Sequence, residues 1–347
     1  MLLGLGASFG SSSAEAPDKL KAIENIGLQS VIDRIFALLQ DGSVDKQPVS
    51  LANIFWACAK MGYVDLPLYD VIVEETMRHL VELDCQECSN MCWAFASLEL
   101  FHGPLLTQLR IRAMDLIPRF DLQDLSNTSW ALAKLGVLDE PLMSAVADAS
   151  CGRLQEGIPQ NLSNLAWSFA TLAVRPLPLL DELATASRAR CAEFEMQDLT
   201  NIAWSFATLE IVHGPLMDVV AEQALDRSRR VLARPDRCRA TLQELAFALV
   251  SLSWAFAFTS SLAEDLASEL KSALLQIGGE IDARYASSDV VSSRAGAAFH
   301  REASPPLESS ASPELVIAQP GIAVILKPPG WEVDGPQSQP GGNKKPL

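Results

Sequence analysis

The residues best suited to chemistry in this chain are five asparagines that recur every 37 positions. They are Asn53, Asn90, Asn127, Asn164 and Asn201. A carboxamide both donates and accepts hydrogen bonds, so a row of them can hold an extended ligand such as an RNA backbone. The same row can instead bond loops or the backbone of neighbouring repeats and so fix their stacking. Because the residue type never varies, the row can position a ligand but cannot encode a sequence.

A second row of side chains with hydrogen-bonding groups lies seven positions after each asparagine. It consists of Lys60, Ser97, Lys134, Thr171 and Thr208. The residues nine positions after each asparagine also vary; they are Gly62, Glu99, Gly136, Ala173 and Glu210. Some modular RNA-binding proteins read one base per helical repeat with two or three side chains, and this arrangement fits that pattern. The alternative is that these positions are simply solvated.

Arginines gather in three places. The densest group comprises Arg227, Arg229, Arg230, Arg234, Arg237 and Arg239, and smaller groups are Arg110, Arg112 and Arg119, and Arg188 and Arg190. The dense group can bind phosphates, although a charged helix end followed by an exposed loop explains it equally well. The formal net charge of −16 argues against coating nucleic acid by bulk attraction. Any RNA contact therefore requires a locally basic stripe on an acidic body.

The sequence predicts no metal site, cofactor or complete catalytic site. The spacing Cys85-x-x-Cys88-x-x-x-Cys92 resembles a metal cluster, but a closed zinc site needs four ligands, and His79 and His102 are not at ligand spacing. The seven cysteines are an odd number and read as small core residues of a reducing compartment. The four histidines form no catalytic triad, and no glycine-rich phosphate loop is present.

A 37-residue unit must position these side chains. A tryptophan lies three positions after each asparagine, at Trp56, Trp93, Trp130, Trp167 and Trp204, and Pro-Leu pairs begin at Pro67, Pro104, Pro141, Pro178 and Pro215. We expect a first helix that is apolar except for a narrow wedge with the asparagine, and a more charged outer helix that begins at the Pro-Leu pair. Later units carry helix-capping residues at Asp124, Asn161 and Asp198. The tryptophans are expected in the core, where replacement by alanine costs about 3–5 kcal/mol.

The sequence predicts an all-α, right-handed α-solenoid of helical hairpins with a 37-residue period, followed by a short, fragmentary β tail. The predicted solenoid spans residues 17–280, with an incomplete capping repeat in residues 18–40 and five regular units in residues 51–230. A degenerate sixth unit at 240–277 has Glu244 in the asparagine position and Phe247 in the tryptophan position, and its last helix (262–277) ends before Gly278-Gly279. The flanking segments are a flexible N-terminus (1–16), a linker (281–313) and a tail (314–347) with two short β-type runs.

Composition bounds the remaining properties. With 49% hydrophobic residues the chain has ample material for a core, which excludes general disorder. No stretch of the sequence approaches the length of a membrane span. The chain reads as intracellular, and its short apolar start leaves a mitochondrial or plastid targeting remnant open. The sequence does not indicate an oligomeric state.

The unit Leu-x-Asn-x-x-Trp-Ala/Ser-x-Ala-x-Leu, with Pro-Leu opening the second helix, resembles the helical repeats of organelle RNA-processing factors. These are the octotricopeptide-type repeats and the leucine-rich region of FAST-kinase-like and RAP-domain proteins. The resemblance covers about residues 18–277. It implies binding to organellar transcripts and an influence on their stability, processing or translation.

The tail resembles the opening of RluA-type pseudouridine synthases, a strand pair that ends in a Lys-Pro-x-Gly turn and then a valine. Residues 313–333, which include Lys327, Pro328 and Gly330, carry this resemblance. The catalytic aspartate of that family belongs to an HRLD-type motif farther downstream, which this sequence does not contain. The resemblance therefore implies an isomerase only in a longer product, and whether the chain has enzymatic activity is left open.

Two functions follow from the sequence. The first is an RNA-binding helical-repeat module with single-stranded RNA as its partner, and it extends to the targeting arm of a pseudouridine synthase. The second is a protein–protein interaction scaffold, which the acidic charge favours. Surface charge separates them: RNA binding requires the polar wedge and the Arg227–Arg239 group to form a connected positive groove.

Overall fold

The computed structural model describes residues 28–40, 47–285, 314–319 and 322–326. The chain divides into two compact units, Met1–Leu274 and Leu275–Leu347. The predictions for the N-terminus (1–16), for most of the linker and for most of the tail lie outside the described residues, as does the start of the predicted capping repeat.

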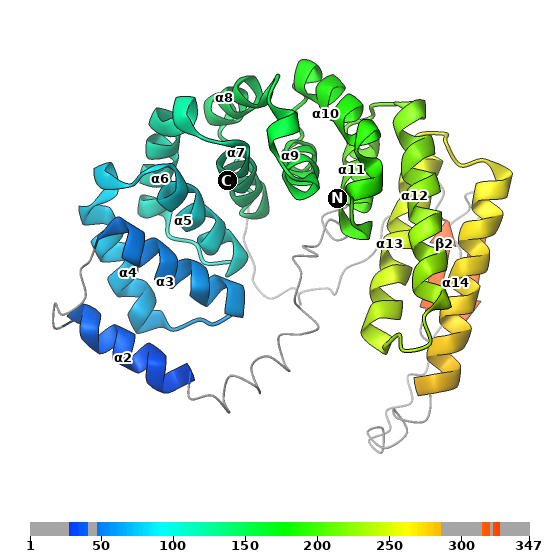
Figure 1. The fold of residues 1–347 in the computed structure, drawn as a ribbon, viewed down its shortest axis with the longest axis horizontal. Helices are drawn as coiled ribbons and strands as arrows, with labels where there is room; N and C mark the ends of the chain where they lie inside the picture. Colours follow the sequence, from blue (N-terminus) through cyan, green and yellow to red (C-terminus); the bar gives the residue numbers. More distant parts are fainter. Residues whose placement is uncertain (1–27, 41–46, 286–313, 320–321, 327–347) are drawn as a thin grey trace, which may run out of the picture. The chain divides into compact units, whose positions relative to one another are not determined.

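The first unit consists of helices in two alternating layers (Figure 1). The inner layer contains α3 (Pro48–Met61), α5 (Cys85–Ser97), α7 (Leu122–Lys134), α9 (Pro159–Thr171), α11 (Met196–Thr208) and α13 (Arg239–Phe258). The outer layer contains α4 (Leu66–Arg78), α6 (Gly103–Leu116), α8 (Glu140–Ser150), α10 (Leu177–Ala189) and α12 (Gly214–Ala233). Helix α2 (Leu28–Gln40) precedes the layers. Each inner helix packs mainly on the next inner helix. The predicted all-α class is confirmed for this unit, and the arrangement is consistent with an α-solenoid.

Local capping fixes where the inner helices begin. From α3 to α11 their first residues are Pro48, Cys85, Leu122, Pro159 and Met196, each 37 positions after the last. The residues predicted as caps lie at the third position of their helices. There Asp124, Asn161 and Asp198 accept hydrogen bonds from the backbone N–H groups of residues 121, 158 and 195 at 3.3, 3.0 and 3.1 Å. A side chain at this position satisfies an N–H group that has no partner within the helix.

The outer helices begin at the Pro-Leu pairs, as predicted, with proline in their first turn. A polar residue caps four of them from the preceding position. Asp65 and Asp139 accept from the N–H groups of Leu68 and Leu142 through a carboxylate oxygen. His102 and His213 do the same through Nδ1, toward Leu105 and Leu216. Two of the histidines without a catalytic or metal pattern are thus helix caps.

Each inner helix from α3 to α13 is followed within two residues by one residue in the left-handed conformation. These residues are Gly62, Glu99, Gly136, Ala173, Glu210 and Ser260, with φ between 54° and 66°. Through α11 they are the row nine positions after each asparagine. Only glycine adopts this conformation without cost. The left-handed backbone therefore limits which residues can occupy this row. The differences between units at this position cannot be attributed to base recognition alone.

The left-handed residue also corrects the register of the sixth unit. Trp56, Trp93, Trp130, Trp167 and Trp204 each precede it by six positions, and Trp254 precedes Ser260 by six. The tryptophan position therefore belongs to Trp254 and the asparagine position to Ser251, so the assignment to Phe247 and Glu244 was wrong. The extra residues lengthen α12 and α13 to 20 residues each, where α9, α10 and α11 have 13.

The chain continues in α14 (Glu264–Tyr285), which runs through Gly278-Gly279 instead of ending before them. Glycine in a helix costs about 1 kcal/mol but does not forbid it. Beyond it, β1 (Glu314–Gln319) and β2 (Ile322–Leu326) pair antiparallel, with Leu315 opposite Ile325 and Gln319 opposite Ile322. Two strands alone do not make a stable domain.

Candidate nucleic-acid interface

Three rows of side chains share the exposed face of the inner layer. On an α-helix, residues spaced by three, four and seven positions lie on one side. The asparagine, the tryptophan three positions later and the residue seven positions later meet this condition in every unit. Asn53 is exposed, Asn127, Asn164 and Asn201 are half-buried, and Asn90 is 9% exposed. The structure thus brings the two predicted polar rows together and places an aromatic row between them.

Four of the five tryptophans are not buried in the core, so the prediction was wrong for them. Trp56 is 40% exposed, Trp93, Trp130 and Trp204 are half-buried, and only Trp167, at 7% exposed, is buried. The core between the layers is filled instead by residues such as Phe55, Phe95, Phe169 and Phe206. The distribution of apolar residues around a single helix does not show which apolar side is covered by neighbouring helices. An exposed row of aromatic side chains therefore looks the same in the sequence as a buried one.

Four of the tryptophans form a continuous ladder. The ring centroids of consecutive members are 6.5 Å apart for Trp56 and Trp93, 6.2 Å for Trp93 and Trp130, and 6.3 Å for Trp130 and Trp167. At the other end of the layer, Trp254 (38% exposed) stacks on Phe258 (51% exposed) at 5.3 Å. Exposed aromatic side chains on successive repeats offer stacking surfaces to unpaired bases.

The two lysines of the row behave differently. Lys60 is exposed, and its Nζ lies 4.9 Å from the ring centroid of Trp93 and 5.6 Å from that of Trp56. The Nζ of Lys134 lies 2.7 Å from a carboxylate oxygen of Glu99. This hydrogen bond and the charge of Lys134 lower the pKa of the Glu99 carboxyl.

The hydroxyls of the same row are less accessible than expected. The Ser97 and Thr171 hydroxyl oxygens are shielded from solvent and find no hydrogen-bond partner in the described part of the chain. Thr208 is exposed. The side chains of this row therefore differ in exposure. Neither a base-reading role nor full solvation describes all five positions.

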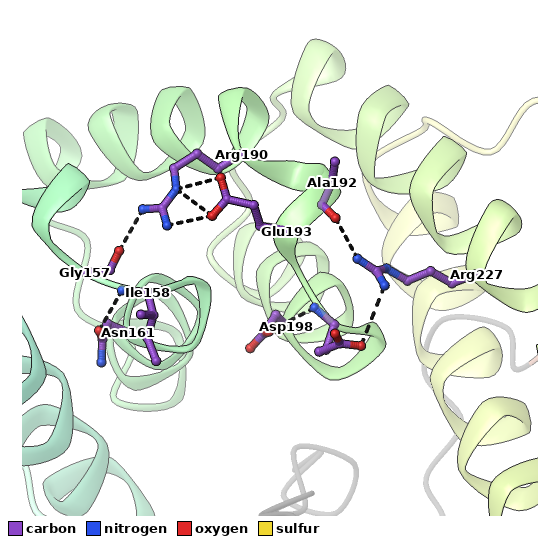
Figure 2. A network of polar contacts seen from close by, with 9 residues as sticks. Gly157, Ile158, Asn161, Arg190, Ala192, Glu193, Asp198 and Arg227 are labelled. Carbon is purple, nitrogen blue, oxygen red and sulfur yellow. Dashed lines mark hydrogen bonds and ion pairs between the residues drawn. The ribbon is translucent and has the colours of Figure 1, made fainter.

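The arginines lie elsewhere, and several bond to main-chain carbonyls of the preceding unit (Figure 2). Arg190 donates to the carbonyl of Gly157 at 2.7 Å, and Arg227 donates to that of Ala192 at 2.9 Å. Arg153 donates to Phe120 at 3.0 Å, and Arg112 to Leu83 at 3.0 Å. Arg153, Arg190 and Arg227 are 37 positions apart, so their period was the sequence signal for this set.

Carboxylates pair with three more of the predicted arginines. Arg110 pairs with Asp139 at 2.6 Å, Arg230 with Asp226 at 2.7 Å, and Arg229 with Glu269. Arg237 donates to the carbonyl of Arg234. Arg119, Arg188 and Arg234 are exposed, and Arg239 is half-buried at the start of α13. The Arg227–Arg239 group thus lies on α12, on the loop after it and at the start of α13. It does not lie in the rows of asparagines and lysines.

A second set of contacts joins consecutive inner helices. Ser89 donates to Asp124 at 2.6 Å, Asn161 to Ser126 at 3.0 Å, and Ser163 to Asp198 at 2.7 Å. Burial raises the pKa of the Asp124 and Asp198 carboxyls. The partners are 35 positions apart, so the 37-residue period does not reveal them.

Within the described ranges, no three His, Cys, Asp or Glu side chains are placed to hold a metal ion. The seven cysteines are free thiols. Of the described helices, only α13 is long and apolar enough to cross a membrane by length and composition, so the expectation that no stretch approaches that length was wrong. A buried core helix passes the same test.

A profile described as RNA-editing substrate-binding complex 6 protein matches residues 20–254. No curated protein matches the chain. The match covers most of the helical layers, up to residue 254 within α13, and ends before residues 313–333. The octotricopeptide-type assignment and the pseudouridine synthase resemblance therefore stay predictions. The matched span is more than half of the 347 residues, and the chain belongs to this family of RNA-editing substrate-binding complex proteins.

Proposed function

We propose that this protein is an RNA-binding helical-repeat protein that contacts single-stranded RNA along the exposed face of its inner helices. The ladder of Trp56, Trp93, Trp130 and Trp167 carries this proposal, because flat aromatic faces beside hydrogen-bonding side chains suit unpaired bases. All of its members except the buried Trp167 are exposed or half-buried. The family supports an RNA-related role. The proposal includes a right-handed solenoid with a 37-residue period, in which successive units present equivalent side chains to one strand.

The acidic body determines the kind of binding. The net charge is −16, and many of the arginines are held by carboxylates or main-chain carbonyls. We therefore expect few phosphate contacts, and a larger share of the affinity from stacking than in basic RNA-binding proteins.

Fluorescence anisotropy of the whole chain with a labelled pool of randomised single-stranded RNA tests the proposal. The wild type should bind with micromolar or tighter affinity at low salt. Trp56→Ala combined with Trp93→Ala should weaken binding by at least about tenfold, because stacking contributes about 1–3 kcal/mol per base. Phe101→Ala is the matched control, since Phe101 is 66% exposed and lies in the loop before α6. Equal losses for both variants would contradict the assignment of the interface.

A protein–protein scaffold is the second candidate, and the same acidic, largely paired surface favours it. Absence of RNA binding by the wild type at low salt would support the scaffold over the RNA-binding role. The extension to a pseudouridine synthase arm rests on residues 313–333, and an isomerase assay on a longer gene product tests it.

A further inference from the structure

Lys60 is the basic residue of the described structure whose ammonium makes cation–π contacts. Its ammonium lies over two indoles of the ladder, 4.9 Å from the Trp93 centroid and 5.6 Å from that of Trp56. No carboxylate among the described residues forms an ion pair with it. The site it occupies is open, because both Lys60 and Trp56 are exposed.

The third unit provides an internal comparison. Lys134 is 74 positions after Lys60, and the indoles at the corresponding positions, Trp130 and Trp167, are 6.3 Å apart, against 6.5 Å for Trp56 and Trp93. Here, however, Glu99 of the preceding unit binds the ammonium at 2.7 Å, and the Lys134 side chain is only 15% exposed. At these two equivalent positions, the ammonium of Lys60 pairs with no carboxylate of the described residues and can bind a ligand, whereas that of Lys134 is paired with Glu99.

We infer that Trp56, Lys60 and Trp93 form the principal nucleotide subsite of the inner face, and that Glu99 keeps the equivalent subsite at Lys134 closed. In this subsite the base of an unpaired nucleotide stacks on the exposed face of Trp56, and Lys60 binds its phosphate. Asn53 lies one turn before Trp56 on the same face and supplies a carboxamide at its edge. The inference rests on the proposed RNA-binding function.

The chemistry favours this occupant for two reasons. A cation–π contact at an exposed site is weak, whereas an ammonium–phosphate hydrogen bond is charge-assisted, so Lys60 can exchange one for the other. Its aliphatic stem remains on the indoles while the ammonium turns outward. At Lys134 a phosphate would have to displace Glu99 and then lie beside a repelling carboxylate.

The experiment compares lysine variants of the whole chain in anisotropy titrations with labelled single-stranded RNA at several salt concentrations. Lys60→Met retains the apolar stem and should weaken binding and lower the salt slope by about 1. Trp56→Ala should weaken binding by about 5- to 150-fold, because stacking contributes about 1–3 kcal/mol per base. Lys134→Met should change the affinity less than twofold. Glu99→Gln should tighten binding and raise the slope by about 1, because it releases Lys134.

Each outcome has a definite meaning. RNA binding that Lys60→Met and Lys134→Met weaken equally, or that neither affects, would overturn the subsite and leave the proposed function intact. A wild type that binds no RNA at low salt would overturn both. Thermal unfolding of each variant serves as the folding control, and Lys60 and Trp56 are exposed enough for little change.

Discussion

The left-handed position after each inner helix is the clearest residue-scale conflict between local preference and fold. Gly62 and Gly136 fit it, but Ala173 adopts φ 55° with a side chain. A Cβ in this conformation approaches a carbonyl oxygen, which costs about 1–2 kcal/mol. The repeat tolerates that cost because packing of the helices on either side fixes the turn.

Ala173→Gly should therefore stabilise the protein. We expect a gain of about 0.5–1 kcal/mol, since relief of the left-handed strain exceeds the added freedom of the unfolded chain. Urea unfolding followed by circular dichroism measures it. Ala170→Gly, inside α9, is the control and should cost about 1 kcal/mol. A lower urea midpoint for Ala173→Gly would show that the side chain makes a compensating contact.

The buried carboxylate of Asp124 gives a pH prediction. Burial raises its pKa in the folded state above the unfolded value, so the charged form is less stable in the fold. Its unfavourable contribution is fully present above the raised pKa and disappears as the pH falls toward the unfolded value near 3.8. Asn161 occupies the same position in the next unit and still bonds the corresponding serine, Ser126, but as the donor through its amide nitrogen.

Asp124→Asn should thus raise stability at pH 7 by up to about 1 kcal/mol, because it retains the contact with Ser89 and removes a buried charge. The gain should shrink as the pH approaches 4. Urea midpoints of both proteins between pH 4 and 8 test this. Asp121→Asn is the control at the exposed cap of the same helix. A gain that persists at low pH would assign the effect to packing.

At the scale of elements, Arg153, Arg190 and Arg227 form an arginine ladder, because they recur every 37 positions and each donates to a main-chain carbonyl in the preceding linker. Arg190 directly follows α10, and its guanidinium donates a hydrogen bond to the carbonyl of Gly157 in the linker before α9. Its ion pair with Glu193 holds the side chain in place. A hydrogen bond from a charged donor contributes more to stability than one from a neutral donor. Removing the guanidinium should therefore cost more free energy than removing a neutral donor.

Arg190→Ala should destabilise the fold by about 1–3 kcal/mol. Arg188→Ala, two residues away but exposed, should change stability by less than about 0.5 kcal/mol. Thermal unfolding of both variants provides the comparison. Equal effects would mean that the Gly157 contact contributes little to stability.

An element could be predicted from the sequence where residues close by in the chain determine it, and could not where distant residues do. The outer helices could be placed from sequence because proline at the start of a helix is a local signal. The 37-residue spacing of Arg153, Arg190 and Arg227 is visible in the sequence, but their partners could not be predicted, because main-chain carbonyls have no sequence identity. The tryptophans were misassigned because exposure depends on which face the outer layer covers. The sixth unit was misaligned because Phe247, 43 residues after Trp204, fits the apolar pattern of the first helix. The left-handed Ser260 instead places the repeat at Trp254, 50 residues after Trp204.

For the whole molecule, nearest-neighbour packing makes the unit exchangeable. Each inner helix contacts mainly the helices before and after it. Removal of residues 122–158 would bring Ser89 opposite Asn161 and Trp93 opposite Trp167, which are pairings of types already present. A solenoid that loses one internal repeat keeps its remaining interfaces.

The deletion of residues 122–158 should therefore give a folded, helical protein with a modestly lower melting temperature. Deletion of residues 122–151 removes about as much chain but breaks the register of every later contact, and it should abolish cooperative unfolding. Circular dichroism melts of the two proteins decide the question. Similar melts would mean that the units are not interchangeable modules.

The long pair α12 and α13 has a consequence for which units can lie beside one another. Each helix has 20 residues, seven more than α9, α10 and α11, so each is about 10 Å longer at 1.5 Å per residue. A 13-residue helix is about two turns too short to cover either of them. Whole 37-residue units therefore match one another among the shorter helices upstream, where neighbouring lengths agree, but a unit of that size does not match the long pair.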